Sequence, residues 1–589
     1  MVAIPSFVLR RLYVKGSLHN TDQGCTFALK NIVDRGTVTQ LGQLEVDGTA
    51  YPPERLRVHT AQGSILPGDQ ITPGAPLILP QGVGIRLRLP GVALSPGKHH
   101  LRLRFQTQEV GELEFAVSDE LQAGQASGEI PPGEDAKAKA SSAAPQIWEA
   151  GHRARDLKIA ILGAGSAVFA RQLIADLLCT PGLERGTFAL VDIDAGRLEL
   201  AHGIAERLVE RSGQAWTVES STQRRDLLPG CDYVISLIEV AGLRNVRHDY
   251  EIPLKYGVDQ CIGDTSGPGG IFKMLRTGPA WLDIVHDVEQ LCPQAIVMNY
   301  SNPMSALTLL ALRATSLQLV GLCHSVQGTS KDLSGYLDVP LEELRYRCAG
   351  INHMAWFVEL THRGEDLYPR LREAARDPEI YECDPVRFEM MLHFGAFVTE
   401  SSGHFSEYLP YFRKRPDLLE KYMCEGYRGE SGFYANNWPR WRTEADEAIR
   451  AQLAGRSEIV LARSDEYASY IVEARESGRP AVFHGNVLNE GLIDNLPAGG
   501  CVEVPLLVDG AGLQPIHFGP LPTQMAAPNA AHMYMHELMV QAVLERQRPA
   551  ALQALMLDPL TAAVLSPAEI RAMFEEMWAA QQADLQAFD

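Results

Sequence analysis

Several features that would direct this chain of 589 residues to a membrane or to export are missing from its sequence. No run of about 18 apolar residues is present, which excludes an ordinary transmembrane helix. The N-terminus, MVAIPSFVLRRLYVKG, lacks a basic segment followed by a long apolar run, so it does not read as a signal peptide. The ten cysteines have no paired spacing, which predicts reduced thiols and a cytoplasmic protein.

An excess of positive charge is also absent. The formal net charge is −20, which argues against nucleic acid or an anionic membrane as a partner. Charged residues make up 21% and hydrophobic residues 46% of the chain, as in an ordinary globular protein. A chain of this length is expected to form more than one domain.

Residues 1–118 predict a small all-β domain. Short segments such as ERLRVHT, GIRLRLP and HHLRLRFQT alternate apolar with polar residues, and Gly, Pro and Asp separate them. This pattern is typical of an antiparallel sandwich or barrel. Arg102 and Arg104 then belong to a solvated strand face, with a docking or sugar-binding module as the alternative. Residues 119–154 are rich in Ala, Gly, Ser, Pro and charge, and predict a flexible linker.

From Leu157 onward, apolar strands alternate with amphipathic helices. LKIAILGAGS, TFALVDID, CDYVISLIEV, QAIVMNYSNP and LQLVGLCHS are the predicted strands, each followed by a helical pattern. This order predicts a doubly wound, mostly parallel Rossmann-like sheet over 155–350. The remaining segment, 351–589, mixes helices with short strands and predicts an α+β C-terminal domain that covers the substrate and supports oligomers.

The turn after the first of these strands predicts a nucleotide site. Gly163, Gly165 and Ser166 would let the backbone approach a pyrophosphate at a helix N-terminus, although Val168 replaces the third glycine of the usual pattern. Asp192, at the end of the next strand, could accept from ribose hydroxyls and favours NAD over NADP. Either Asp192 or Asp194 could instead cap the following helix.

Two later segments place polar residues where such a sheet binds ligands. The glycine-rich loop CIGDTSGPGG surrounds Asp264 and Thr265, which indicates close approach to a ligand. NYSNP places Asn299 and Asn302 at a strand end, and either could be a turn residue before Pro303.

Two further strand ends predict a metal site. GLCHSVQGT carries Cys323 and His324, and GINHMAW carries Asn352 and His353. A thiolate and an imidazole from neighbouring strands can hold a divalent metal with open coordination positions, although buried cysteine is common without any metal. Chemistry alone does not select the metal.

In this order and spacing, GAGS, GDTSGPGG, NYSNP, CHSVQGT and GINHMAW resemble the family-4 glycoside hydrolases, from about Leu157 to the C-terminus. The CHSVQGT form resembles the α-galactosidase branch acting on melibiose- and raffinose-type sugars. An α-glucosidase or α-glucuronidase of the same family is the alternative. A sugar dehydrogenase and a non-catalytic NAD or sugar sensor are the alternatives from other classes. Residues 1–150 fall outside the resemblance.

The resemblance implies NAD and Mn²⁺ as cofactors and a homodimer or homotetramer. It implies that the sugar C3 hydroxyl is oxidised, the C2 proton removed, the aglycone eliminated and water added, with NAD regenerated. Cys323 and His353 would be metal ligands. Asn302 would contact the sugar near the nicotinamide, and Asp264 would bind sugar hydroxyls.

The resemblance leaves alternatives open for the residues that act as acid and as base. His324 stands where relatives place a candidate acid, and support of the metal ligands is its alternative. Several relatives use a tyrosine base, and HFGAFVTESSGHFSEYLPYF supplies Tyr408, Tyr411, His404 and Glu407, of which Tyr408 is preferred. His484 and His517 either line the site or are structural.

Overall fold

The computed structural model describes residues 13–14, 17–21, 24–30, 36–60, 65–79, 84–107, 111–121 and 155–588. The chain divides into two compact units, one ending at Pro145 and the other beginning at Gln146. Most of the predicted linker, residues 122–154, lies outside the described residues. No helix in the described part of the chain is both long and apolar enough to cross a membrane.

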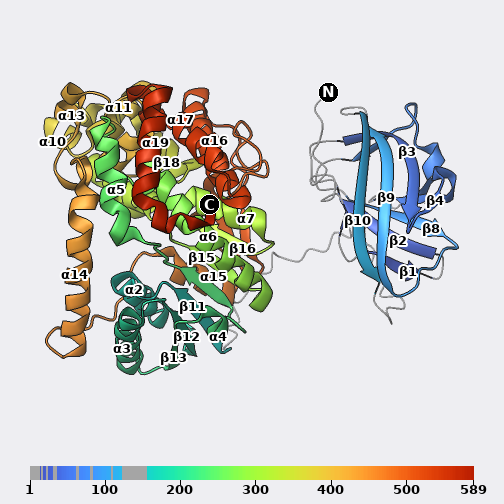
Figure 1. Cartoon of the computed structure of the whole chain (residues 1–589), viewed down its shortest axis with the longest axis horizontal. Coiled ribbons are helices and arrows are strands. Elements are labelled where there is room, and N and C mark those ends of the chain that lie inside the picture. Colours follow the sequence, from blue (N-terminus) through green and yellow to red (C-terminus); the bar gives the residue numbers. More distant parts are fainter. Residues whose placement is uncertain are drawn as a thin grey trace. The chain divides into compact units, whose positions relative to one another are not determined.

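The first unit consists of two antiparallel sheets (Figure 1). One has the order β1 (His19–Thr21), β2 (Gly24–Lys30), β8 (Gly84–Pro90), β5 (Arg57–His59), β6 (Ile65–Pro67). The other has the order β10 (Gly111–Leu121), β9 (Gly97–Thr107), β3 (Gly36–Val46), β4 (Thr49–Tyr51), with β7 (Leu77–Leu79) beside β3. The short helices η1 (Pro53–Arg55) and η2 (Gly68–Gln70) lie between strands.

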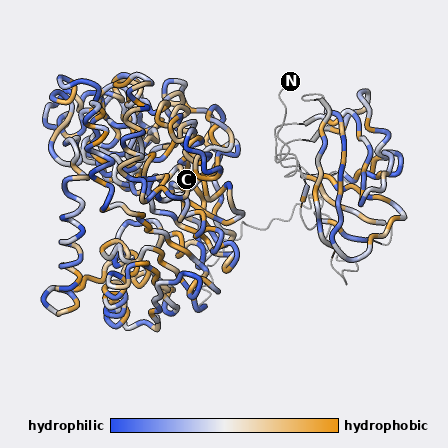
Figure 2. Tube along the Cα trace, viewed as in Figure 1, coloured by the Kyte–Doolittle hydropathy of each residue, from blue (hydrophilic) through white to orange (hydrophobic). Residues whose placement is uncertain are grey.

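Alternation along these strands builds one core between the two sheets. Every second residue of β9 is buried, and Figure 2 shows the same alternation of hydrophilic and hydrophobic residues. Phe27 and Leu87 meet Leu44 and Leu103 in this core. The predicted all-β fold is therefore confirmed for this unit.

The charged face of β9 is exposed. Arg102 forms ion pairs with Glu45 and Glu114, and Arg104 pairs with Glu114, with about half of each arginine side chain accessible. The arginines thus lie on a solvated strand face.

The second unit is built on a sheet of thirteen strands. Its parallel part runs β13 (Ala215–Ser221), β12 (Arg185–Val191), β11 (Leu157–Leu162), β14 (Tyr233–Ser236), β15 (Ile296–Asn299), β16 (Gln318–Gly321). Alternate residues of β11 enter two separate hydrophobic clusters, Ile159 and Ile161 on one face and Ala160 and Leu162 on the other. Burial on both faces explains the continuous apolar runs, and the predicted Rossmann-like sheet is confirmed.

The sheet continues into the C-terminal part of the chain. Antiparallel strands follow in the order β21 (Ala481–Leu488), β22 (Cys501–Asp509), β17 (Leu344–Ile351), β18 (Met354–His362), β19 (Glu365–Asp366). The strands β20 (Phe397–Val398) and β23 (Gly512–Pro515) pair with β18 and β22. The predicted division at residue 350 falls inside the β17–β18 hairpin, so both predicted domains contribute to a single sheet.

Helices cover both faces of this sheet (Figure 1). Those of the Rossmann-like part are α2 (Ala167–Leu178), α3 (Ala195–Ser212), α4 (Arg224–Leu227), α5 (Gly242–Lys255), α6 (Gly267–Leu291), α7 (Met304–Ala314) and α8 (Ser325–Leu337). After η3 (Leu341–Glu343) come α9 (Tyr368–Ala374), α10 (Pro378–Tyr381), α11 (Pro385–Phe394), α12 (Ser402–Phe405), η4 (Ser406–Tyr408), α13 (Pro416–Tyr422) and η5 (Gly426–Arg428). The last are α14 (Phe433–Leu453), α15 (Tyr467–Ser477), α16 (Thr523–Glu545), α17 (Arg548–Leu557), α18 (Pro559–Val564), α19 (Pro567–Gln581), η6 (Gln582–Asp584) and η7 (Gln586–Phe588).

Helix α14 connects distant parts of the second unit. It packs near α5 and then runs to α3 and α2 beside the first parallel strands (Figure 1). Its Ile449 is fully buried against Ile204 of α3, and Leu453 lies against Gly203. The C-terminal part is thereby attached to the Rossmann-like half.

We predict that a chain beginning at Arg155 folds alone, because the second unit has its own cores and Arg155 already pairs with Asp232 and Glu476 of that unit. Differential scanning calorimetry should show its unfolding transition at the temperature of the corresponding transition in the full chain. Insolubility, or a transition lowered by more than about 5 °C, equivalent to roughly 4–5 kcal/mol for a unit of this size, would show that the first unit stabilises the second.

Candidate active site

The turn after β11 has no room for side chains. Gly163 has φ +80°, and a Cβ atom there would stand 2.7 Å from the carbonyl oxygen of Leu237. A Cβ atom on Gly165 would lie 2.6 Å from Asp192 Oδ2. The turn leads directly into the N-terminus of α2, the place where a Rossmann-like fold binds a pyrophosphate.

The two acidic residues after β12 have different tasks. Asp194 caps α3, accepting from the backbone N–H groups of Gly196 and Arg197. Asp192 accepts from the N–H of Gly165 at 2.7 Å and of Asp194 at 2.9 Å, which keeps its carboxylate beside the glycine turn. Asp192 thus lies beside the turn that is predicted to bind NAD, and Ser166 is exposed at the start of α2 without capping it.

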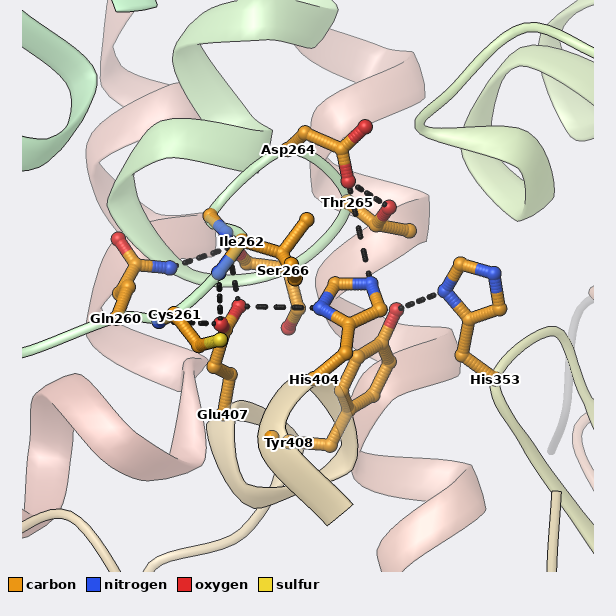
Figure 3. A network of polar contacts seen from close by, with 12 residues as sticks. Gln260, Cys261, Ile262, Asp264, Thr265, Ser266, His353, His404, Glu407 and Tyr408 are labelled. Atoms are coloured by element: carbon orange, nitrogen blue, oxygen red, sulfur yellow. Dashed lines mark hydrogen bonds and ion pairs between the residues drawn. The ribbon is translucent and has the colours of Figure 1, made fainter. Parts of the chain in front are cut away.

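The glycine-rich loop between α5 and α6 is held by a buried carboxylate from the C-terminal part. Glu407 accepts from the backbone N–H groups of Cys261 (2.7 Å), Ile262 (2.6 Å) and Gly263 (3.0 Å), as Figure 3 shows. His404 Nδ1 contacts the same carboxylate at 3.3 Å. Burial opposes ionisation of Glu407, but His404 and the backbone donors lower its pKa below the usual value.

This loop presents Asp264 to a small polar network. The Asp264 carboxylate accepts from Thr265 Oγ1 at 2.6 Å, from Lys273 Nζ at 3.2 Å and from Asn302 Nδ2 at 3.2 Å. Burial alone would raise the pKa of Asp264, but Lys273 and then His404 hold it well below its ordinary range. Asp264 and Asn302, both predicted to bind substrate, are therefore brought together, with Asp264 ionised.

Cys323, His353 and Glu400 form a possible metal centre. Their ligand atoms all lie within 4.8 Å of one another. His353 Nε2 is 3.4 Å from Cys323 Sγ and 3.4 Å from Glu400 Oε2. Thiolate, imidazole and carboxylate together form a donor set for a divalent transition metal, so these residues fit the predicted ion.

The charges of this centre are matched for a cation. Burial raises the pKa of Cys323 to about 11, and Glu400 adds to that rise. Burial would also raise the pKa of Glu400, but the imidazoles of His353 and His404 lower it to about 2. A cation bound here would favour the thiolate of Cys323 beside the ionised Glu400.

Tyr408 lies behind His353. Its hydroxyl group is 3.2 Å from His353 Nδ1 (Figure 3). The other ring nitrogen, Nε2, is left to contact Cys323 and Glu400. If Nε2 is a metal ligand, Nδ1 carries the proton and donates to the tyrosine oxygen. The ring of His404 contacts both residues, at centroid distances of 4.7 Å from His353 and 5.5 Å from Tyr408.

His324 is separate from the metal ligands. Its side chain is 71% exposed, and its Nδ1 lies 3.7 Å from Glu466 Oε1. The residue follows Cys323 and stands at the N-cap of α8, where its side chain makes no capping hydrogen bond.

The remaining asparagine and histidine candidates from the sequence differ in their contacts. Asn299 forms a local turn with Ser301, whereas Asn302 Oδ1 is buried without a hydrogen-bond partner among the described residues. His517 is largely exposed and pairs with Asp494, and His484 is buried against Tyr346.

Sequence reasoning missed Glu400, Lys273 and the task of Glu407. Glu400 has φ +73°, an unusual value for a residue other than glycine, but no sequence pattern marks it. Lys273 could have been noticed as one charge in the apolar start of α6 directly after the glycine loop. The hydrogen bonds of Glu407 depend on a contact between segments about 145 residues apart, and the sequence holds no signal for it.

Comparison with known proteins gives matches on both sides of this site. A profile described as "Family 4 glycosyl hydrolase" matches residues 158–339, and one described as "Family 4 glycosyl hydrolase C-terminal domain" matches residues 348–561. An alpha-galactosidase of Bacillus subtilis is 41% identical over 72% of this chain and 98% of its own length. An alpha-galactosidase of Rhizobium meliloti is 38% identical over 72% of this chain and 88% of its own length.

Solved structures show the same fold. A Bacillus subtilis protein provisionally named a glucosidase is 26% identical, with a TM-score of 0.64 over 72% of this chain and 99% of its own. A 6-phospho-alpha-glucosidase from gut microorganisms, solved with NAD and Mn²⁺, is 21% identical, with a TM-score of 0.62 over 73% of this chain and 99% of its own. A profile of the hydroxymethylglutaryl-CoA reductase N-terminal domain matches residues 8–122, and this short match assigns no activity.

The fold and the site define an α/β enzyme with a dinucleotide-type glycine turn and a candidate metal centre. The chain belongs to family 4 of the glycosyl hydrolases, because both family profiles match and a relative is 41% identical over nearly its whole length. The family membership predicted from the motifs is thus confirmed.

We predict that Cys323→Ser and Glu400→Gln each weaken Mn²⁺ binding at least about tenfold, the usual effect of removing a partner from such a site. Isothermal titration calorimetry on the purified protein measures this directly, and circular dichroism checks that the fold is retained. His324→Ala is the matched control and should bind Mn²⁺ as the wild type does. Wild-type affinity in Glu400→Gln would remove Glu400 from the ligand set.

We predict that Glu407→Gln lowers the free energy of unfolding by about 1–3 kcal/mol, because a backbone N–H then faces an amide donor instead of an acceptor. The exposed Glu420→Gln is the control and should change little.

The pH dependence provides a second test of Glu407. A carboxylate whose folded pKa is depressed stabilises the fold above its unfolded pKa, near 4.5, and loses this effect as pH falls through the folded value. Urea unfolding should therefore show the difference between wild type and Glu407→Gln at pH 7 shrinking below pH 4.5. A difference independent of pH would contradict the ionised state assigned to Glu407.

Proposed function

We propose that this enzyme hydrolyses α-galactosides of the melibiose or raffinose type, using NAD and Mn²⁺. The observation that carries the proposal is the Cys323–His353–Glu400 cluster, with Tyr408 on the far nitrogen of His353 and Asp264 nearby. Relatives that are 41% and 38% identical are named alpha-galactosidases, which supports galactose as the sugar. Relatives named alpha-galacturonidase and alpha-glucosidase are 30% identical or less, so galacturonides and glucosides are less favoured than galactosides as substrates.

The two cofactors have separate places. Gly163, Gly165 and Ser166 would hold the NAD pyrophosphate and Asp192 its ribose, while bound NAD supplies reversible hydride transfer at the C3 carbon of the sugar. Cys323, His353 and Glu400 would hold the metal, and a bound divalent cation supplies a Lewis acid for negative charge on the sugar oxygens.

Asp264 and Asn302 would orient the sugar. Asp264 is kept ionised by Lys273 and can accept from sugar hydroxyl groups, while Asn302 donates to Asp264 and retains a free buried carbonyl oxygen among the described residues. A hydroxyl group that donates to Asn302 Oδ1 would satisfy this buried oxygen. Both residues would hold the C2 and C3 positions steady for the proton and hydride transfers.

Tyr408 is the proposed base that removes the C2 proton. Burial raises its pKa well above the ordinary value, and Asp264 and Glu400 raise it further. A donor at His353 Nδ1 works in the opposite direction, because it stabilises the phenolate oxygen. The base is therefore effective only when His353 Nε2 is engaged and positive charge is nearby.

His324 would protonate the leaving oxygen. Its exposure allows reprotonation from solvent after each turnover, and its Nδ1 lies 3.7 Å from Glu466 Oε1. We further propose a cytoplasmic homo-oligomer, on the basis of the unpaired cysteine spacing and of the family expectation.

The decisive test is isotope exchange. Hydrolysis of methyl α-galactoside in D₂O should give galactose that carries deuterium at C2, because removal and return of the C2 proton exchange it with solvent. Proton NMR would show loss of the C2 signal, and free galactose incubated with the enzyme for the same time controls for later exchange. Galactose with full hydrogen at C2 would exclude proton abstraction and the role of Tyr408, and accumulated NADH with a keto sugar would indicate a dehydrogenase.

A further inference from the structure

Five aromatic side chains gather on η5 and the first turns of α14. We call Tyr427, Phe433, Tyr434, Trp438 and Trp441 the aromatic platform. Tyr427 stacks on Trp441 at 6.1 Å between centroids with an interplanar angle of 18°, and Tyr434 stacks on Trp438 at 5.1 Å and 16°. Phe433 packs on the first pair, with its ring 4.7 Å from that of Tyr427 and 5.2 Å from that of Trp441. Tyr434 joins the two pairs, because its ring lies 6.5 Å from that of Trp441 at an interplanar angle of 61°.

The aromatic platform is not used by the hydrophobic cores of the described residues. None of its members belongs to either cluster that flanks the sheet. Tyr427 is 54% exposed, and the other four rings are half-buried. Tyr427 thus exposes an aromatic ring that continues into half-buried rings, and apolar surface of this kind is commonly part of a binding site.

Backbone hydrogen bonds fix the platform beside the candidate active site. The N–H of Gly432 donates to the carbonyl of Gln260 at 2.8 Å, and the N–H of Tyr434 donates to that of Cys261 at 3.0 Å. These carbonyls belong to the loop that Glu407 holds and that carries Asp264. The platform therefore keeps a constant position relative to Asp264.

Two rings of the aromatic platform reach the candidate active site. Tyr434 and Trp438 line a pocket together with Asp264, Lys273 and Glu239. The pocket holds about 20 Å³, the size of a single water, so a hexose would have to lie on the outer ring faces. Burial raises the pKa of Tyr427, and the charges of Asp264 and Glu400 raise it further. This is consistent with a Tyr427 hydroxyl group on the side of these two carboxylates.

We propose that the aromatic platform binds the leaving-group sugar, so that the preferred substrates are galactosyl disaccharides and trisaccharides. This inference rests on the proposed α-galactosidase function. A pyranose ring presents a face of C–H groups with partial positive charge, which suits the negative faces of stacked aromatic rings. Asp264, Lys273 and Glu239 lie next to the platform, in the lining of the adjoining pocket.

The test compares two substrates that differ only in the leaving group. Melibiose releases glucose, whereas methyl α-galactoside releases methanol and has no second ring. Tyr427→Ala and Trp441→Ala should each raise KM for melibiose about tenfold, equivalent to about 1.4 kcal/mol, and leave kcat/KM for methyl α-galactoside within about twofold. Tyr427→Phe keeps the ring and should behave as the wild type.

A control on another face is available. Tyr534 on α16 is 57% exposed, and Tyr534→Ala should leave KM for melibiose and kcat/KM for methyl α-galactoside unchanged. Equal losses on both substrates in Tyr427→Ala, or no loss on either, would overturn the inference. A change of molar mass in Tyr427→Ala by light scattering, with equal losses on both substrates, would instead show that the patch is an interface between copies of the chain.

A binding measurement separates this inference from the proposed function. Saturation-transfer NMR with glucose should give signals for the wild type and weaker signals, with about tenfold lower affinity, for Tyr427→Ala. If the wild type hydrolyses neither substrate, the proposed function fails, and the glucose measurement still decides the platform. Equal glucose binding by the wild type and Tyr427→Ala would refute the platform as a sugar site.

Discussion

The arrangement of the whole site depends on one buried carboxylate. Glu407 is fully buried and binds three consecutive backbone N–H groups of the loop that carries Asp264, while its neighbours His404 and Tyr408 extend toward the candidate metal centre. A carboxylate in such a position is stable only because the backbone donors and His404 replace the lost water. The same interaction joins the Rossmann-like half to the C-terminal part, and it holds the loop that carries Asp264 beside the segment of His404 and Tyr408.

The charge balance of the site follows from this packing. Asp264, Glu400 and Glu407 are all ionised despite burial, because Lys273 and the two imidazoles of His353 and His404 surround them. Asp264 and Glu400 also raise the pKa of Tyr408, so the site without cations disfavours a phenolate. A cation bound at Cys323, His353 and Glu400 would oppose this effect and favour the phenolate of Tyr408.

The continuous sheet explains how distant motifs meet. Strands β21 and β22 stand between β16, which precedes Cys323, and the β17–β18 hairpin, whose turn carries His353. The positive φ of His353, +64°, and of Glu400, +73°, turn both residues out of regular structure toward Cys323. Strain of this type is retained where the surrounding structure determines it, and here it serves to gather three ligand atoms.

Much of this protein could be read from its sequence alone. Continuous apolar runs, which reflect burial on both faces of the sheet, predicted the parallel strands. Alternation of apolar and polar residues predicted the β-sandwich. Gly163 and Gly165 marked a turn in which neither position has room for a Cβ atom. Cys323 and His353 could be predicted as metal ligands because each stands just after an apolar strand that the sequence marks clearly. Glu400, Lys273, the loop contact of Glu407 and the aromatic platform were decided only by the tertiary structure. Single charged and aromatic residues in irregular segments have no period, and their partners lie far away along the chain, so only the packed fold brings them together.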